Sequence, residues 1–517
     1  MADNAPDGES QSPIARSPES LWIATTPRTD YEPLAGDLTV DTVVVGGGIA
    51  GLTAAVRLKE AGRDVAVVEA DRIVDEATGR TTAKVTSQHG LAYDSLVSTF
   101  GREQARQYAA ANEAAIDEIE RRVEEEGIDC DFRRTPAYVY AASGEDVRSI
   151  REEVRAADAL GLPASFAEET PLPFETPGAI RFDDQAEFHP RKYLLAVAEA
   201  VDGDGSHLFE ETRALDVDPG RRPRVETERG EITADQVVVA SHFPFFDRGG
   251  YFARMHPKRA YLLAAQVGET PLEGMYLSTA SPSDTIRTAP VPGSDEELLI
   301  VGGQSHKPGL DGSSTSERYR RCEAFAREHF DVESIEYRWS THDYSPVDGV
   351  PFVGQLGPGT ENVYVATGFG GWGMTGGTAA GMILSELIVE GESPWADVFD
   401  PLRVTPGASA REFVGENATV GARFVGDRLR SLLSRDVDLP AAGEGKVVRQ
   451  GGRPIAVHRD DEGELHTVSA VCPHLWCLVD WNDAERTWDC PCHGSRFDCD
   501  GEVLSGPALE GLSDLGD

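Results

Sequence analysis

The chain of 517 residues has few cysteines and no long apolar run, and each shortage excludes a class of protein. Seven cysteines are too few for a disulfide scaffold of this length. No stretch of about 18 apolar residues occurs, so we expect no membrane-spanning helix. Residues 1–36 are polar and contain several prolines, without the apolar core of a secretory signal. A cytoplasmic location is therefore expected.

Positive charge is also scarce. Asp and Glu number 89 against 48 Lys and Arg, which gives a formal net charge of −41 at pH 7, and only six of the basic residues are lysine. Such a surface repels nucleic acid and anionic lipid, so neither is an expected partner. It also repels itself, which suits surroundings where salt screens charge. We interpret the composition as that of a halophilic protein; an acidic enzyme from an ordinary environment is the alternative.

The order of patterns predicts an α/β protein with several domains, because 517 residues exceed one ordinary core. A strand–glycine–helix–strand pattern from Thr39 predicts a Rossmann-like unit, later strand patterns predict an inserted antiparallel sheet, and short strands with turns at the C-terminus predict an all-β domain. We expect an extended lead-in (1–37), an oxidoreductase domain (38–395) with an inserted substrate subdomain (roughly 130–190 and 245–345), a linker (396–436) and the all-β domain (437–517).

Helical periodicity accompanies these strands. Charged, helical patterns cover about 101–126 and 145–160, an apolar helical pattern covers 378–391, and a polar helix-like stretch lies near 411–434.

A glycine motif follows the first buried strand. Gly46, Gly48 and Gly51 supply G-x-G-x-x-G, in which the first glycine permits a tight turn, the second lets the backbone approach a pyrophosphate, and the third lets helix and strand pack closely. The helix that follows presents free N–H groups to phosphates. Glu69 ends the next strand, at the position that binds ribose. The alternative is a glycine-rich turn between packed elements, but the context favours a bound dinucleotide.

A second glycine-rich stretch, residues 368–377, follows another buried strand more than 300 residues later. A second helix N-terminus there could meet the far end of an extended cofactor. This favours FAD over NAD.

Two short motifs near the C-terminus combine cysteine and histidine. Cys472 and His474 form C-x-H, and Cys490 and His493 form C-x-x-H after 15 intervening residues. Two loops of this kind can hold two irons, with both thiolates on one iron and both imidazoles on the other. Zinc also accepts such a set, but zinc fingers use pairs of like ligands. The spacing therefore predicts a Rieske [2Fe–2S] cluster.

Roughly residues 20–395 resemble the D-amino-acid-oxidase-like FAD superfamily, closest to its gamma-glutamylputrescine oxidase and D-amino-acid dehydrogenase branch. The matching motifs are SLWIATTPRTDYEPLAGDLTVDTVVVGGGIAGLTAA, YSPVDGVPFVG (344–354) and ATGFGGWGMTGG (366–377). The resemblance implies that Glu69 binds the ribose of FAD. It also implies that these residues line the flavin: Thr81, Thr82, Gly370, Gly371, Trp372, Gly373, Met374 and Thr375.

One segment departs from that family. Its SGRNGG-type sequence is replaced here by TGRTTAKVTSQHG (78–90), so Lys84 and His89 are candidates for contact with flavin or substrate, against a supporting structural role. No general base is assigned, because flavin chemistry can proceed without one. Other candidates for the cavity lie at strand ends or loops: His242, His342, Asp343 and Tyr344. Residues expected to be structural are His189, Cys130 and Cys322.

Residues 437–517 resemble Rieske domains. By that resemblance Cys477 and Cys492 form a disulfide between the ligand loops, Ser495 donates to a bridging sulfide, and SGPALEGL (505–512) covers the cluster. Two positions differ from the usual pattern: Phe497 replaces a tyrosine of high-potential members, and Trp476 replaces a glycine. Cys499 has no expected partner.

These features predict a FAD-dependent dehydrogenase that oxidises a small amine or amino-acid-like substrate. Its electrons would pass to its own cluster and then to an external one-electron acceptor, with His474 and His493 as the expected exit. Two alternatives remain. One is an electron-transfer or redox-sensing protein without a small substrate of its own; the other is an O2-using amine oxidase with a structural cluster.

Overall fold

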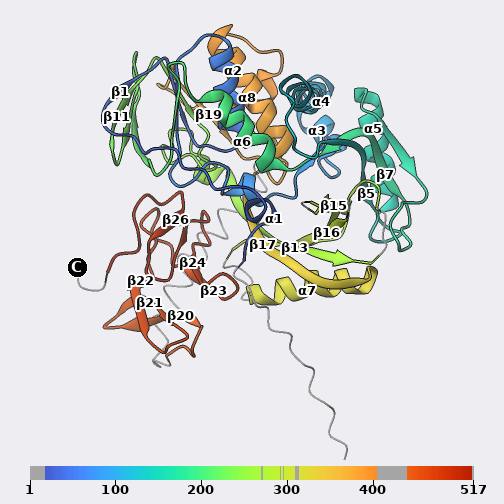
Figure 1. Ribbon diagram of the computed structural model, residues 1–517. Helices are drawn as coiled ribbons and strands as arrows, with labels where there is room; N and C mark the ends of the chain where they lie inside the picture. The colour runs from blue at the N-terminus through green and yellow to red at the C-terminus, as the bar shows by residue number, and fades with distance from the viewer. Residues whose placement is uncertain are drawn as a thin grey trace, which may run out of the picture.

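The computed structural model describes residues 18–268, 272–291, 293–294, 296–308, 314–404 and 439–514. Figure 1 shows a large α/β body and, beside its long strands β13 and β17, a smaller C-terminal domain of strands β20 to β26. The predicted fold class is confirmed: a Rossmann-like domain with an inserted antiparallel sheet, followed by an all-β domain.

The Rossmann-like sheet has six strands in the order β18-β19-β12-β2-β3-β8. All neighbours are parallel except β18 and β19. Strands β2 and β3 are completely buried valine-rich runs, as expected for parallel strands with both faces covered. The bounds are β2 (Thr42–Val45), β3 (Val65–Val68), β8 (His207–Phe209), β12 (Gln236–Val239), β18 (Phe352–Gln355) and β19 (Val363–Thr367).

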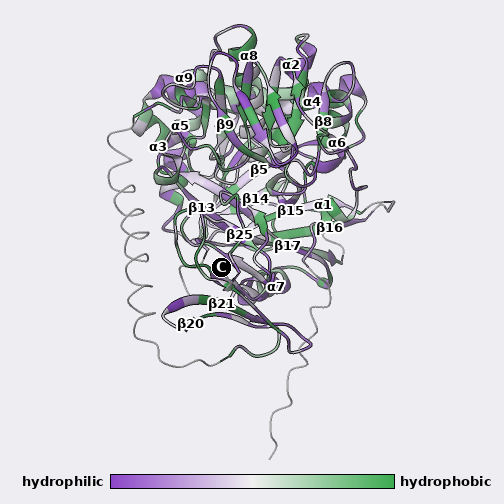
Figure 2. Ribbon diagram, turned by 90° about the vertical axis from the view of Figure 1, so that its left-hand side faces the viewer, coloured by the Kyte–Doolittle hydropathy of each residue, from purple (hydrophilic) through white to green (hydrophobic). Residues whose placement is uncertain are grey.

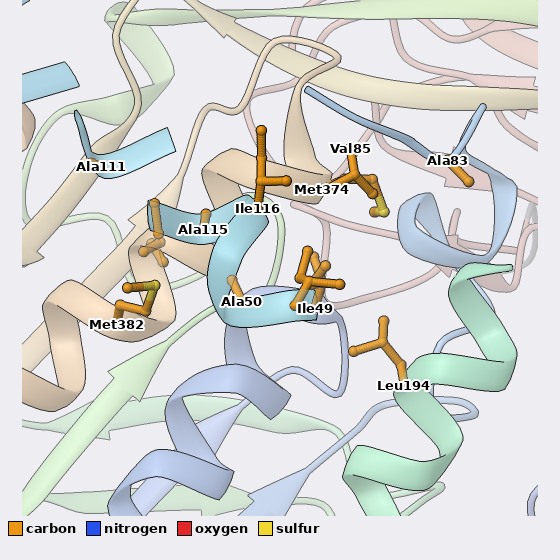
Figure 3. Close-up of a cluster of buried hydrophobic side chains, with 14 of the residues drawn as sticks. Ile49, Ala50, Ala83, Val85, Ala111, Ala115, Ile116, Leu194, Met374 and Met382 are labelled. Atoms are coloured by element: carbon orange, nitrogen blue, oxygen red, sulfur yellow. The ribbon is translucent and has the colours of Figure 1, made fainter. Parts of the chain in front are cut away.

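Helices α2 (Ile49–Glu60) and α8 (Gly373–Val389) pack against each other beside this sheet. A Cβ atom at Gly381 would lie 2.6 Å from Cβ of Thr53, so only glycine permits their close approach. Helices α4 (Arg102–Glu126) and α6 (Pro190–Val201) complete this layer, and side chains of all four helices form a common core (Figure 3). Most of α8 carries hydrophobic colours in Figure 2, as its burial requires.

The inserted sheet has nine strands, mostly antiparallel, in the order β17-β13-β16-β15-β14-β5-β7-β4, with β6 paired to β7. Helices α5 (Val147–Leu160) and α7 (Thr315–His329) pack on it. The bounds are β4 (Lys84–Val85), β5 (Arg133–Tyr140), β6 (Ala164–Ala167), β7 (Ala179–Glu187), β13 (Met255–Val267), β14 (Met275–Ser278), β15 (Thr285–Pro290), β16 (Glu297–His306) and β17 (Val332–Pro346).

The large body also contains a small four-stranded sheet. Its order is β1-β11-β10-β9, with bounds β1 (Leu38–Thr39), β9 (Ala214–Asp218), β10 (Arg224–Thr227) and β11 (Gly230–Thr233). The remaining short helices are α1 (Leu21–Ala24), η1 (Ala77–Arg80), α3 (Tyr93–Phe100), η2 (Tyr251–Ala253) and α9 (Ala396–Phe399).

The C-terminal domain consists of two small antiparallel sheets around a core that includes Trp488, Phe497 and four cysteines. The first sheet contains β20 (Gly445–Gln450), β21 (Arg453–Arg459) and β22 (Leu465–Ser469). The second contains β23 (Asp480–Asn482), β24 (Thr487–Asp489), β25 (Arg496–Phe497) and β26 (Val503–Ser505).

Some local expectations differ from the structure. Helices α4 and α5 occupy the ranges that their periodicity predicts. Helix α8 begins at Gly373, five residues earlier than its apolar pattern suggested, because the glycines of the preceding stretch join its first turn. Within the expected extended lead-in, α1 forms one helical turn whose Trp22 is buried. The helix-like stretch near 411–434 lies outside the described residues. Within the described residues, no helix is long and apolar enough to span a membrane.

Candidate functional site

The first glycine motif forms the turn between β2 and α2. Gly46 has φ +113°, and a Cβ atom there would lie 2.4 Å from the carbonyl oxygen of Ala240. A Cβ at Gly51 would lie 2.0 Å from the carbonyl oxygen of Gly46. The N-cap residue Gly48 has no side chain, and at the N-terminus of α2 the N–H of Ile49 donates to Oγ1 of Thr78 at 3.3 Å. The N-terminal end of α2 lines the cavity through Gly48, Ile49 and Ala50, and this position fits a dinucleotide phosphate.

Glu69 lies at the end of β3, next to this turn. Its Oε2 accepts a hydrogen bond of 2.8 Å from the N–H of Gly47, and its Oε1 accepts one of 3.1 Å from the N–H of Asp71. Burial raises the pKa of this carboxyl group, although the two N–H donors act against that rise. The side chain is thus held at the mouth of the glycine turn, where a ribose would lie.

A cavity of about 500 Å3 runs from this turn to the inserted sheet. Its lining includes Glu69 and Gly48 of the first glycine turn, and also Thr81, Thr82 and Lys84. The second glycine stretch also lines the cavity, with residues Gly370, Gly371, Trp372, Gly373 and Met374. The two glycine-rich stretches, far apart in sequence, therefore face one cavity, as a bound FAD molecule requires.

Two residues of the expected cofactor site, Gly51 and Thr375, do not line this cavity. Gly51 lies behind the turn, packed against Gly46. Thr375 is buried and donates from its hydroxyl group to the carbonyl oxygen of Thr86. Both residues lie outside the cavity. Gly51 packs against Gly46 of the first glycine turn, and Thr375 holds the backbone of Thr86.

The two candidates in the replaced segment take different positions. Lys84 lines the cavity, and its Nζ donates to the carbonyl oxygen of Tyr276 and to the hydroxyl of Thr285, each at 2.5 Å. Burial and the neighbouring Arg287 lower the pKa of Lys84 to about 7. His89 lies behind the wall, where its ring stacks on Trp372 with a centroid distance of 4.8 Å.

Asp343 holds the second glycine stretch at the cavity. Its Oδ2 accepts a hydrogen bond of 2.5 Å from the N–H of Gly371, and its Oδ1 lies 3.4 Å from Nε2 of His242. His242 has φ +65°, an unusual conformation for a residue with a side chain, and it lines the cavity. His342 does not line it; this buried ring faces the C-terminal domain.

Tyr344 lines the cavity and contacts the C-terminal domain at the same time. Its hydroxyl group donates to the carbonyl oxygen of His493 at 2.8 Å and also lies 3.3 Å from that of Gly506. Burial raises its pKa far above the usual value. The hydroxyl is therefore a hydrogen-bond donor to the neighbouring domain and is unsuited to act as a base.

The residues expected to be structural lie in cores. His189 caps α6 by accepting from the N–H of Lys192, and Cys130 and Cys322 are buried with free thiols. Cys499, with its half-buried thiol, lies next to Asp500.

The two ligand motifs form loops with the same backbone pattern. In the first, the N–H of Cys472 donates to the carbonyl oxygen of Cys477 at 2.9 Å. In the second, the N–H of Cys490 donates to the carbonyl oxygen of Ser495 at 2.8 Å. Each loop thus spans six residues and begins with Cys-Pro. A disulfide between Cys477 and Cys492 joins the loops, which confirms the expected pairing.

The four candidate ligands converge between these loops. The rings of His474 and His493 lie 5.1 Å apart at 90°. Their Nδ1 atoms are buried and have no hydrogen-bond partner in the described part of the chain. Burial lowers both pKa values, that of His493 to about 4, so both rings are neutral, as metal ligands must be. Cys472 and Cys490 are buried free thiols, and the hydrogen bond from Cys490 lowers the pKa of Cys472 to about 7. This donor set fits a Rieske cluster.

Two further residues of the cluster region are completely buried. Ser495 Oγ accepts from the N–H of Ala508 at 3.0 Å, which connects the ligand loop to the segment expected to cover the cluster. Phe497 is packed opposite Trp488 and offers no donor to a ligand sulfur.

The C-terminal domain closes the cavity from one side. Residues 504–509 line it together with the glycine stretches. His493 is 4% exposed, and Phe243, Phe252 and Tyr344 of the large body surround it. The surface position expected of His493 as an electron exit is therefore wrong, because the large body covers its ring.

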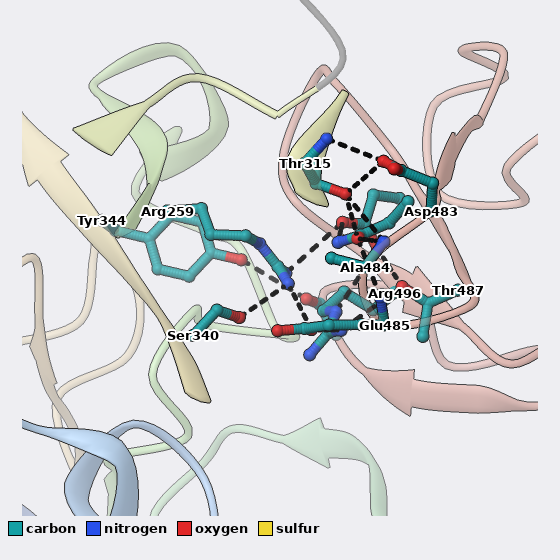
Figure 4. A network of polar contacts seen from close by, with 12 residues as sticks. Arg259, Thr315, Ser340, Tyr344, Asp483, Ala484, Glu485, Thr487 and Arg496 are labelled. Carbon is teal, nitrogen blue, oxygen red and sulfur yellow. Dashed lines mark hydrogen bonds and ion pairs between the residues drawn. The ribbon is translucent and has the colours of Figure 1, made fainter. Parts of the chain in front are cut away.

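A buried network of charges fixes this arrangement (Figure 4). Arg259 of β13 donates to Glu485 at 3.0 Å and lies 3.6 Å from Asp489. Arg496 pairs with the same two carboxylates. At one edge, the N–H of Thr315 donates to Asp483 at 2.7 Å. Two cations and two anions are thus enclosed between the domains with no net charge.

No local pattern in the sequence indicates this network. Arg259 and Glu485 are 226 positions apart, and each belongs to a residue type that is common on an acidic protein's surface. Phe243 was also missed, although its ring lies 6.2 Å from that of His474 and 6.3 Å from that of His493. Only pairing information between distant positions could have found these contacts.

Comparison with known proteins agrees with both halves of the chain. The family described as "FAD dependent oxidoreductase" matches residues 41–387, and the family described as "Rieske [2Fe-2S] domain" matches residues 431–515. The Rieske 2Fe-2S iron-sulfur protein YhfW of Bacillus subtilis is 39% identical over 96% of this chain and 98% of its own length.

Some more distant relatives match the larger part. Gamma-glutamylputrescine oxidoreductase of Escherichia coli is 24% identical and covers 76% of this chain and 94% of its own length. Among solved structures, L-proline dehydrogenase from P. horikoshii superposes with a TM-score of 0.58 at 20% identity, over 72% of this chain and 98% of that one. Glycine oxidase from Geobacillus kaustophilus gives a TM-score of 0.57 at 20% identity, over 71% and 99%. These structures share the fold of the larger part.

Proposed function

This chain belongs to the FAD dependent oxidoreductase family and carries a C-terminal Rieske [2Fe–2S] domain, and we propose that it oxidises a small amine or amino-acid-like substrate and transfers the electrons to its own cluster. When bound, FAD supplies a two-electron acceptor and the cluster a one-electron carrier. The observation that carries the proposal is the closure of the flavin cavity by residues 504–509 of the Rieske domain.

The flavin site is built mainly from backbone. The α2 N-terminus would bind the phosphates, Glu69 the ribose, and the stretch 370–374, held by Asp343, the ring system. Thr81 and Thr82 would line the flavin, while Gly51 and Thr375 fix the turns from behind.

The substrate would bind between this ring site and the inserted sheet. Lys258 of β13 lines the cavity, is exposed, and lies opposite Asp343 in the strand register. An ammonium group there can bind a substrate carboxylate. Lys84 is less suitable, because its Nζ already donates twice and its pKa is lowered to about 7. We therefore assign carboxylate recognition to Lys258.

The cluster would be held by Cys472, His474, Cys490 and His493. The bond from Tyr344 to the carbonyl oxygen of His493 joins a cavity-lining residue directly to a ligand residue. Phe243 fills the space beside both imidazoles and excludes water there. The histidine side of the cluster thus faces the flavin domain.

The test is an anaerobic screen of amino acids and amines, with flavin bleaching as the readout. A substrate that bleaches the flavin identifies the class, and Lys258→Met should raise KM for amino acids more than tenfold with little effect on amines. Lys446→Met is a matched control, since Lys446 lies on β20 of the Rieske domain. If no amine or amino acid bleaches the flavin, the protein is an electron carrier without such a substrate. Fast oxidation by O2 without cluster reduction would indicate an oxidase instead.

A further inference from the structure

Several exposed apolar side chains gather around the cluster site. Among the described residues, Trp476 is 63% exposed, Phe252 46% and Leu475 37%. Leu475 directly follows His474, and the ring of Phe252 lies 6.2 Å from that of His493. We call these three residues the exit surface. Exposed apolar residues beside the cluster ligands of so polar a protein indicate a site of interaction.

Trp476 has a strained backbone conformation. Its φ is +57°, in the left-handed region where a Cβ atom meets the backbone and glycine is preferred. The equivalent position of the second ligand loop is Gly494, with φ +76°. The indole is mostly in solvent, so burial against the described residues does not offset this strain. A strained, exposed tryptophan at this place indicates an interaction surface.

This residue also marks the open side of the cluster. Trp476 belongs to the first ligand loop, and its N–H donates to the carbonyl oxygen of Cys472 at 3.0 Å. The second loop offers no such route, because His342 and Pro257 of the flavin domain pack against Gly494. The exposed edge of the first loop is therefore the short path from the cluster to solvent.

We propose that the exit surface binds a one-electron carrier protein, of the haem or copper class, with a basic rim. The net charge of −41 favours a partner of opposite sign over a second copy of this chain or an anionic membrane. Each substrate oxidation releases two electrons, so two carriers are each reduced by one electron. This proposal needs a loaded cluster, but it does not depend on the identity of the substrate.

The experiment bypasses the flavin reaction. Full-length protein is reduced anaerobically with dithionite, freed of excess reductant, and mixed with ferric cytochrome c, a basic haem protein. Ferricyanide, a small acceptor that needs no docking surface, serves as the second acceptor. Trp476→Gly and Leu475→Ser should each slow cytochrome c reduction about tenfold, as for an interface anchor. Both should leave the ferricyanide rate and the cluster's paramagnetic resonance spectrum unchanged.

Two further variants sharpen this result. Trp476→Phe keeps an aromatic ring and should recover most of the rate. Leu465→Ser removes an exposed apolar side chain on β22, 40% exposed, and should have no effect on either acceptor.

Other outcomes overturn the proposal. Unchanged cytochrome c rates in both Trp476→Gly and Leu475→Ser would remove the docking role. An equal loss with ferricyanide would show that these residues act on the cluster itself. A wild-type dimer in sedimentation that Trp476→Gly converts to monomer would assign the surface to a second copy. Binding of wild type, but not the variant, to phosphatidylglycerol vesicles would assign it to a membrane.

Discussion

The two ligand loops of the Rieske domain have the same backbone and opposite surroundings. Each begins with Cys-Pro and closes through a hydrogen bond across six residues, and each has a left-handed residue at its fifth position. In the second loop this residue is Gly494, where a Cβ atom would lie 2.3 Å from Cε1 of His342. In the first loop it is Trp476, exposed to solvent.

This difference shows that packing against the flavin domain determines which side chain fits at the fifth position of each loop. Where the flavin domain packs against the loop, no side chain fits. Where it does not, a large aromatic side chain occupies the same backbone position. We therefore regard the second loop as the side that receives electrons from the flavin domain, and the first as the side that delivers them outward.

Among the substitutions at the contact between the domains, removal of Arg259 should have the largest effect on the free energy of unfolding. Arg259→Met leaves Glu485 and Asp489 buried with only Arg496 as cation, and we expect a loss of about 3–5 kcal/mol in the free energy of unfolding of the docked structure. Urea denaturation measures it. In the double variant Arg259→Met/Glu485→Gln, charge balance returns, so most of the loss should be recovered. A single variant as stable as wild type would show that the network does not hold the domains together.

The same ion pairs predict how stability depends on pH. Burial alone would raise the pKa of Glu485, but Arg496 and Arg259 lower it below the usual value. A carboxyl whose folded pKa is depressed stabilises the fold fully above its unfolded pKa of about 4.3, and this stabilisation is lost as pH falls toward the folded pKa. Unfolding measured between pH 6 and pH 3 should therefore show a steeper loss in wild type than in Arg259→Met/Glu485→Gln. Parallel curves would contradict the linkage.

Gly494→Ala should have the next largest effect. The new methyl group collides with His342, and the left-handed backbone adds strain, so we expect a loss of about 2–4 kcal/mol. In the double variant Gly494→Ala/His342→Ala, the part of this loss that comes from the collision should be recovered, and the part that comes from backbone strain should remain. Thermal unfolding of the three proteins tests this, and full tolerance of alanine would mean that the two domains are not packed as described.

The smallest predicted effect is a gain in stability. Trp476→Gly relieves left-handed strain at a position with no covering neighbour, so the protein should become about 1 kcal/mol more stable, by the same measurement. A substantial loss instead would show that the indole stabilises the fold.

The sequence predicted local features of the site and missed the contacts between domains. The turns at Gly46 and the ligand set around Cys472 and His493 follow from spacing along a single segment, so a motif contains all the required information. The pairing of Arg259 with Glu485 depends on how two separately folded domains meet, which no local pattern encodes. For this reason the histidines were placed on the outer side of the cluster, whereas the flavin domain covers His493.

The central claim is that electrons reach the cluster from the flavin cavity through the His493 side. Full-length protein is mixed anaerobically with a limiting amount of a substrate from the screen, frozen at intervals, and examined by optical and paramagnetic resonance spectroscopy. We predict that the Rieske signal rises within one turnover as flavin absorbance recovers, and that Tyr344→Phe slows this rise while leaving flavin bleaching unchanged. A cluster that stays oxidised beside a fully reduced flavin would contradict the account.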